Sequence, residues 1–281
     1  MDAFWILLAG SLVAITNALL GCWLVLRRSV LVGDAIAHAV LPGIVIAYWV
    51  TQSRASGYML IGAAIVGVFI TWLIETLQTK ATMQQDASIG LSFTFLFAVG
   101  VILVAWVGDK VDLDQDCVLY GDLAFIPLDT RAIWQLVGLL IGVSTFLYVG
   151  HRGLWLTTFD ANYSMAVGVS TTFWHYGLMM AVSCSTVFSF EAVGAVLVVA
   201  FLVVPPATAY LLTENLQTML GLSVLIGLLG VFIGYAVAVF LNTSIAGTMA
   251  TVVGIEFMAV FIWTSFFVNA LPAKIQTDCK S

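Results

Sequence analysis

One short stretch of the chain places an acid and an imidazole among small and apolar residues. It reads Gly33-Asp34-Ala35-Ile36-Ala37-His38-Ala39-Val40-Leu41-Pro42-Gly43. Asp34 and His38 are four residues apart, so on a helix their side chains lie on one face, one turn apart. Pro42 has no N–H group, and the carbonyl of His38 therefore loses its usual helical partner. A carboxylate, an imidazole and a free carbonyl on one helix are suitable ligands for a divalent cation.

The alternative interpretation is that Asp34 caps a helix and that His38 is a hydrogen-bonded core histidine. In a soluble protein this alternative would be favoured. Inside a membrane, acids and imidazoles are costly, and those present usually line a pathway or pair with another group. The metal interpretation is therefore favoured over the capping interpretation if the chain crosses a membrane.

The composition is that of a helical membrane protein. Of the 281 residues, 62% are hydrophobic and 9% are charged, and the mean hydropathy is +1.11, whereas a soluble domain is about 25% charged. No polar stretch is long enough to form a soluble domain, so we expect one all-α transmembrane domain over residues 1–281. The four scattered cysteines predict no disulfide framework, and the net charge of −6 without a basic patch predicts no nucleic-acid partner.

About nine apolar runs are long enough to cross a bilayer as helices. They cover residues 4–26, 30–50, 58–77, 89–107, 132–149, 173–188, 192–212, 219–241 and 248–268. A kink in place of the turn at 189–191 would reduce the count to eight. Pro205 and Pro206 are expected to break the seventh span, as Pro42 breaks the second, either as structural kinks or beside a pathway.

The basic residues indicate the orientation. If Arg27 and Arg28 face the cytoplasm, six of the nine Lys and Arg residues lie inside, with the N-terminus outside and the C-terminus in the cytoplasm. Residues 108–130 then form an external loop with six of the fifteen acids. This loop is either a solvated surface or an electrostatic mouth for cations. Its candidate residues are Asp112, Asp114 and Asp116, and Glu191 is a further candidate for an outer vestibule or for a turn.

Residues 157–169 lie on the cytoplasmic side in this orientation and predict a short helix. Thr158 or Asp160 can cap its start, and Gly168 can end it. Composition alone favours a connector over a docking element. The sequence has no G-x-x-x-x-G-K-[ST] motif, no H-E-x-x-H motif and no G-x-S-x-G motif. We therefore expect no enzymatic activity, and transport would draw its energy from a partner or an ion gradient.

The chain resembles the permease subunits of ABC transporters that import manganese, zinc or iron(II) together with a metal-binding lipoprotein. The resemblance extends nearly end to end and rests above all on the Gly-Asp-x-x-x-His-x-x-x-Pro-Gly block after Leu26-Arg27-Arg28. Further matches lie at 86–90, 97–100, 111–114, 118–121, 158–160, 166–169, 193–194 and 206–209. Where many members carry Pro-Ala this chain has Pro205-Pro206, and relatives commonly have neutral residues in place of Glu191 and Glu256.

The resemblance implies a permease in a bacterial cell membrane, with Asp34 and His38 in the metal pathway. It also implies that 157–169 is a coupling helix docked on a separate ABC ATPase, with Thr158, Phe159, Asp160, Ala166 and Gly168 in it. A metal-binding protein outside the membrane and a second permease, identical or paralogous, would complete the importer. Mn²⁺, Zn²⁺ or Fe²⁺ would be cargo, with no permanently bound cofactor. A permease for a metal chelate of the siderophore or cobalamin type, and a membrane scaffold or sensor, are the alternatives.

Overall fold

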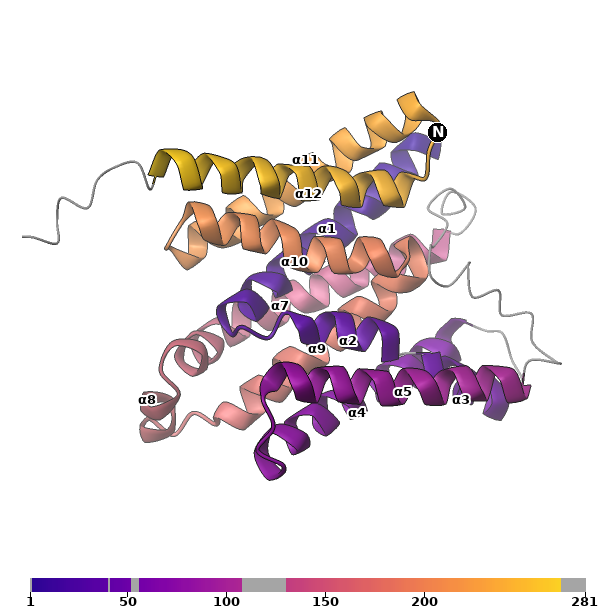
Figure 1. Cartoon of the computed structure of the whole chain (residues 1–281), viewed down its shortest axis with the longest axis vertical. Coiled ribbons are helices and arrows are strands. Elements are labelled where there is room, and N and C mark those ends of the chain that lie inside the picture. The colour runs from indigo at the N-terminus through magenta and orange to yellow at the C-terminus, as the bar shows by residue number, and fades with distance from the viewer. Residues whose placement is uncertain (1, 40, 52–55, 108–129, 269–281) are drawn as a thin grey trace, which may run out of the picture.

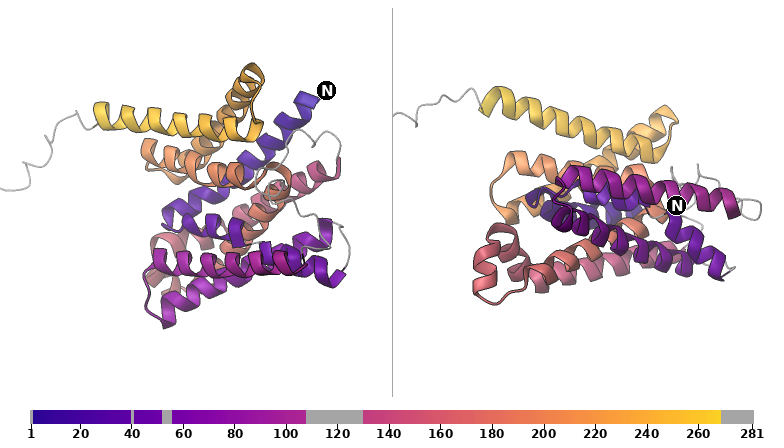
Figure 2. Two further views of the ribbon diagram at one scale, coloured as in Figure 1. Left: turned by 45° about the vertical axis from the view of Figure 1, so that its right-hand side comes forward. Right: turned by 60° about the horizontal axis from the view of Figure 1, so that its bottom comes forward.

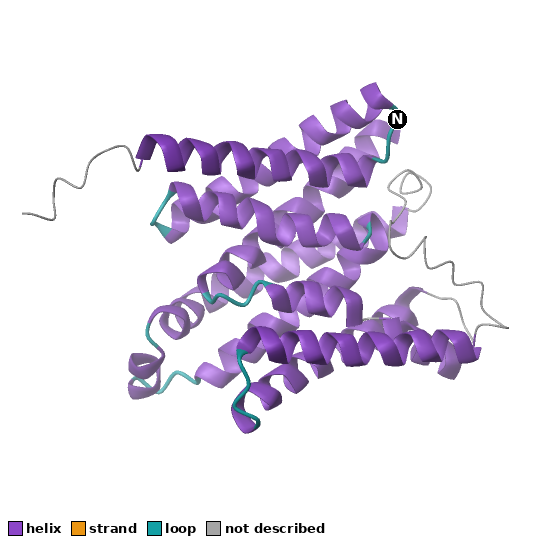
Figure 3. Ribbon diagram, viewed as in Figure 1, coloured by secondary structure: helices purple, strands orange, loops and turns teal. Residues whose placement is uncertain are grey.

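The computed structural model describes residues 2–39, 41–51, 56–107 and 130–268, and nearly all of them are helical (Figure 3). The helices are α1 (Asp2–Leu26), α2 (Leu31–Ala39), α3 (Leu41–Thr51), α4 (Ser56–Lys80), α5 (Gln85–Val107), α7 (Thr130–Phe159), α8 (Ala161–Ala166), α9 (Thr171–Val193), α10 (Ala195–Leu212), α11 (Leu216–Leu241) and α12 (Ile245–Trp263), followed by a π-helical turn over Thr264–Val268.

Seven of the described helices, α1, α4, α5, α7, α10, α11 and α12, are long and apolar enough to cross a membrane. Two more crossings come from α9, which has 23 residues, and from α2 and α3, which follow one another. The prediction of about nine spans in an all-α membrane fold is therefore confirmed. The alternative with eight spans is wrong, because Gly194 at φ 82° separates α9 from α10, and only glycine adopts this backbone conformation readily.

The connections between the long helices gather at two ends of the bundle (Figures 1 and 2). One end, which we call the α8 end, carries α8 and the α1–α2, α4–α5 and α10–α11 turns. The opposite end carries the start of α1 and the α9–α10 and α11–α12 turns. Helix α5 ends and α7 begins at this opposite end, far from α8.

Helix α1 passes through the middle of the bundle (Figure 1) and packs against α7, α9, α10 and α11. Its side chains join two buried apolar clusters. One contains Trp23 and Leu24 with residues of α2, α4 and α9, and the other contains Val13 with residues of α10, α11 and α12. The helix α2, which carries the acid and the imidazole, packs mainly against α5, α4 and α9 and shares the first of these buried clusters with the central helix.

The prolines expected to interrupt helices lie in the second span and in α10. In the second span α2 is described to Ala39 and α3 from Leu41, and the expected break beside Pro42 stays a prediction, because Val40 lies outside the described residues. Helix α10 continues through Pro205 and Pro206, and the kink expected at these two residues stays a prediction. Both prolines are buried. Pro206 has no N–H to donate to the carbonyl of Leu202. That carbonyl lies directly against Gly21 of α1, so there is no room for a Cβ at Gly21. Helix packing thus covers the acceptor that the proline frees.

Candidate functional site

Asp34 and His38 lie on one face of α2, as their spacing predicts. The Nε2 atom of His38 is 3.4 Å from Oδ1 of Asp34. The side chains are 35% exposed for His38 and 46% exposed for Asp34, whereas Ala35, Ile36 and Ala39 on the other side of the helix are buried in the core. This separation into a buried and an exposed face follows from the helical period. The three apolar residues pack on the core side of α2, and the acid and the imidazole are left on the opposite side.

The surroundings of the pair are aromatic on one side. The ring of Phe93 in α5 lies 5.7 Å from that of His38, and Phe97 follows one turn later. No group of three His, Cys, Asp or Glu side chains that could hold a metal ion occurs among the described residues. The described part of this chain therefore offers one carboxylate and one imidazole to an ion, which is fewer ligands than divalent transition metals take in proteins.

Some predicted residues cannot be placed in this geometry. Asp112, Asp114 and Asp116 lie outside the described residues. Glu191 lies in the last turn of α9, and the expected turn at 189–191 is instead helix. Its side chain is not among those described.

The predicted helix over 157–169 is divided at Asp160. Residues Thr158 and Phe159 belong to the last turn of α7, which runs ten residues beyond the predicted end of that span. The separate helix, α8, has six residues, and Asp160 caps it by accepting a hydrogen bond from the backbone N–H of Tyr163 at 2.8 Å. Gly168 follows the helix at φ 82°, where a helix commonly ends. The cap is therefore Asp160 and not Thr158.

Helix α8 protrudes from the bundle (Figures 1 and 2) and exposes apolar side chains. Tyr163, Met165 and Val167 are each more than half exposed, and Ala166 is also at the surface. Ser164 is buried and donates a hydrogen bond to the carbonyl of Val169 at 3.0 Å, which holds the element together. An apolar, protruding helix with a fixed shape is suited to contact another protein.

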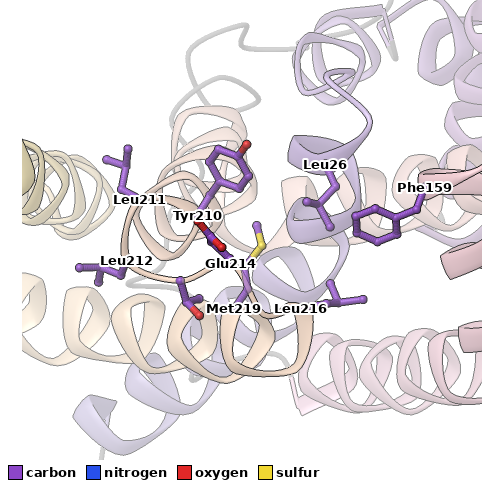
Figure 4. A pocket seen from close by; sticks show the side chains of 9 residues that line it. Leu26, Phe159, Tyr210, Leu211, Leu212, Glu214, Leu216 and Met219 are labelled. Atoms are coloured by element: carbon purple, nitrogen blue, oxygen red, sulfur yellow. The ribbon is translucent and has the colours of Figure 1, made fainter. Parts of the chain in front are cut away.

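An open groove of about 580 Å³ lies beside the start of α8 at the same end of the bundle (Figure 4). Leu26 and Phe159 line it from the ends of α1 and α7, and Tyr210, Glu214 and Met219 line it from the α10–α11 turn and its flanks. The surface around α8 is thus hollowed on one side.

Two polar features were missed by reasoning from the sequence. Arg27, after the end of α1, contacts residues of α7 and α9 that are 130 or more positions away in the sequence. A small cavity of about 30 Å³, large enough for a water molecule, is lined by Ser29, Glu75 and His175 among others. The Oγ atom of Ser29 and one carboxylate oxygen of Glu75 have no hydrogen-bond partner among the described residues. Neither feature has a local motif that could have revealed it.

Glu256 lies in α12, far along the chain from α2. Both of its carboxylate oxygens are buried and have no hydrogen-bond partner in the described structure. Its neighbours include Gly230 of α11, where an added Cβ would lie 3.7 Å from Oε2 of Glu256. The surroundings offer no ligand set, so Glu256 is not part of a metal site formed by the described residues.

Residues 3–265 match the ABC 3 transport family. The chain is 42% identical over 270 residues to the manganese transport system membrane protein MntD of Bacillus subtilis, covering 92% of this chain and 91% of that protein. It is 38% identical over 268 residues to the zinc transport system membrane protein TroD of Treponema pallidum, covering 92% and 73%. Among solved structures it is similar to PsaBC from Streptococcus pneumoniae in complex with Fab, with a TM-score of 0.79, 26% identity, and coverage of 91% and 89%.

These matches cover almost the whole chain, as the resemblance in the sequence predicts. They also agree with the all-α arrangement of membrane-spanning helices. The chain belongs to the ABC 3 transport family and is a membrane permease of the metal ABC transporters.

Proposed function

We propose that the chain is the permease subunit of an ATP-driven importer of a divalent transition metal ion. Two permeases present their α2 helices to a common pathway, and Asp34 and His38 of each contact the passing ion. The cargo class follows from relatives named for manganese and for zinc transport. Carboxylate and imidazole together bind Mn²⁺, Fe²⁺ and Zn²⁺, and the described residues offer no thiolate beside them that would favour Cu⁺.

The observation that carries the proposal is the partial exposure of Asp34 and His38 on a helix of a membrane-spanning domain. Lipid would make these exposed groups costly, so their face of α2 must contact protein or water. A second permease related by a two-fold axis would cover this face and double the ligand set to two carboxylates and two imidazoles. The four groups together match the number of ligands that such ions require.

The proposal also assigns the energy source to a separate subunit. The sequence has no P-loop, so ATP would be hydrolysed by an ABC ATPase in the cytoplasm. Helix α8 is the described element best suited to receive that subunit, because it is short, protrudes from the bundle and exposes apolar side chains. Closure of the ATPase would move α8 and switch access to the ion from outside to inside.

With α8 in this role, the α8 end of the bundle faces the cytoplasm and the N-terminus lies outside. The opposite end would then receive the ion from a metal-binding protein. Residues 108–130 join α5 and α7 at that end, and their acids, including Asp112, Asp114 and Asp116, would raise the local cation concentration.

Uptake of radioactive manganese and zinc by vesicles that contain the permease and its ATPase tests the proposal. We expect uptake that requires ATP and is lost in Asp34→Asn, which keeps the shape of the side chain but removes its charge. Glu214→Gln is the matched control, because it neutralises an exposed carboxylate in the α10–α11 turn, away from α2. Uptake of a metal chelate but not of the free ion, or wild-type uptake by Asp34→Asn, would contradict the proposal.

A further inference from the structure

The residue Arg27 occupies the corner between α1, the central helix, and α2, the helix with Asp34 and His38. The backbone at this corner is closed by hydrogen bonds. The N–H groups of Arg28 and Ser29 donate to the carbonyls of Val25 and Leu24, both at 3.0 Å, and Arg28 adopts φ 55°. This arrangement is a Schellman motif, which ends a helix with a defined geometry.

The same corner leads into α2 without a flexible link. The N–H of Val32 donates to the carbonyl of Ser29 at 3.2 Å, and that of Gly33 donates to the carbonyl of Val30 at 3.1 Å. Ser29 is 4% exposed. A force on the corner therefore reaches the first turn of α2 through hydrogen-bonded backbone.

The side chain of Arg27 leaves this corner and contacts both helices that flank α8. Its Nε donates to Oγ1 of Thr158 at 3.0 Å, and its Nη2 donates to Oγ1 of Thr157 at 2.9 Å. Both threonines belong to the last turn of α7, directly before α8. Its Nη1 lies 3.5 Å from Nδ1 of His175, near the start of α9, the helix that follows α8.

The geometry of the acceptors fits a guanidinium better than an ammonium group. The hydroxyls of Thr157 and Thr158 donate back to the carbonyls of Gly153 and Leu154 in their own helix, at 2.9 and 2.6 Å. Their oxygens are thereby left to accept from Arg27. A planar guanidinium with several fixed donors reaches two hydroxyls and a ring together, whereas lysine is a point charge.

We propose that Arg27 is a positioning residue that transmits movement of α8 to α2 and so to the Asp34–His38 pair. The inference rests on the proposed function, in which an ATPase moves α8. We call Arg27 with Thr157, Thr158 and His175 the Arg27 bridge. Movement of α8 displaces the end of α7 and the start of α9. The Arg27 bridge carries that displacement to the α1–α2 corner, and the first turn of α2 rotates with the corner.

The neighbouring arginine provides a matched control. Arg28 carries the same charge at the next position, but its side chain is exposed and makes no hydrogen bond within the described part of the chain. Arg27→Gln and Arg28→Gln therefore remove the same charge from the same loop and affect membrane orientation equally. Only Arg27→Gln removes the donors of the bridge.

The experiment compares permease variants in vesicles with the ATPase, and measures ions imported per ATP hydrolysed. A residue that only stabilises the fold lowers the yield of complex but leaves this ratio unchanged. We expect Arg27→Gln to lower the ratio about tenfold, within the usual range of coupling between two sites. Metal binding and recovery of the complex should persist, Arg28→Gln should match the wild type, and Arg27→Lys should recover part of the ratio.

A second variant tests the bridge with Arg27 in place. Thr157→Val and Thr158→Val together keep the shape of the α7 terminus but remove both acceptors, and they should lower the ratio as Arg27→Gln does. Combined with Arg27→Gln, they should add little further loss, because both changes remove the same interaction. Equal ratios in Arg27→Gln and Arg28→Gln, or fully additive losses, would overturn the inference while wild-type uptake continued to support the proposed function. Absence of ATP-driven uptake in the wild type would overturn both.

Discussion

His38 follows Asp34 by one turn of α2, and its Nε2 lies 3.4 Å from the Oδ1 of that carboxylate. The two groups make this contact on the face of α2 that the core leaves open, opposite Ala35, Ile36 and Ala39. The pair is thus available to a ligand without any change in the packing of the helix.

His38→Ala should abolish metal binding and uptake while the complex with the ATPase still assembles. The reason is that His38, which we propose as a metal ligand, is 35% exposed, so its loss should cost less than about 1 kcal/mol of stability. Manganese binding by calorimetry and co-purification of the ATPase measure the two effects. Transport by His38→Ala at the wild-type rate would refute the site assignment.

Ala166→Trp should uncouple the complex, because it places a large ring on the exposed surface of α8 that we propose to contact the ATPase. Metal binding at Asp34 and His38 should persist, while ATP hydrolysis no longer drives uptake. Ala87→Trp, at an exposed position in the first turn of α5, is the control. Normal transport and co-purification of Ala166→Trp would show that α8 does not dock there.

Gly21→Ala should destabilise the permease, because the added methyl group would overlap the Leu202 carbonyl of α10. Overpacking of this kind costs about 1–3 kcal/mol. Gly221→Ala in α11 is the opposite case, since nothing lies within 4 Å of its Cβ position, and it should stabilise the helix by about 0.5–1 kcal/mol. Thermal unfolding in detergent should move in opposite directions for the two variants. If both variants raised the melting temperature, α1 and α10 would not pack this closely.

Glu256→Met should leave transport unchanged and raise the melting temperature. The carboxylate oxygens are buried without a partner among the described residues, and an unsatisfied buried polar group costs about 1–3 kcal/mol. Glu256→Gln, which keeps a polar group in place, should gain less. Loss of uptake in Glu256→Met with normal assembly would instead assign the carboxyl a part in transport.

Local patterns in the sequence predicted the features that depend on local chemistry. The apolar runs indicated about nine spans, and the i, i+4 spacing placed Asp34 and His38 on one face. Asp160 and Gly168 marked the two ends of α8 for the same reason, since caps act within a few residues.

Features that depend on packing between distant helices could not be predicted in this way. Helix α10 continues through the double proline, and the group that covers the freed carbonyl of Leu202, Gly21 of α1, comes from a distant part of the sequence. The Arg27 bridge joins residues 130 and 131 positions apart. The polar end of α7 was predicted as part of a separate helix, because hydropathy marks where a helix leaves lipid and not where its hydrogen bonding ends.

The polar core of α9 has a consequence for synthesis of the protein. Ser183, Ser185, Thr186 and Ser189 are buried in this helix, and Asn17 of α1 hydrogen-bonds with Ser185 and Ser189. For this reason α9 is less apolar than a self-sufficient span, and it is not among the seven described helices that qualify by composition. The single residue Gly194 joins it to the strongly apolar α10. We therefore expect α9 to enter the bilayer during translation as one hairpin with α10, held there by its neighbour before α1 supplies its hydrogen bonds.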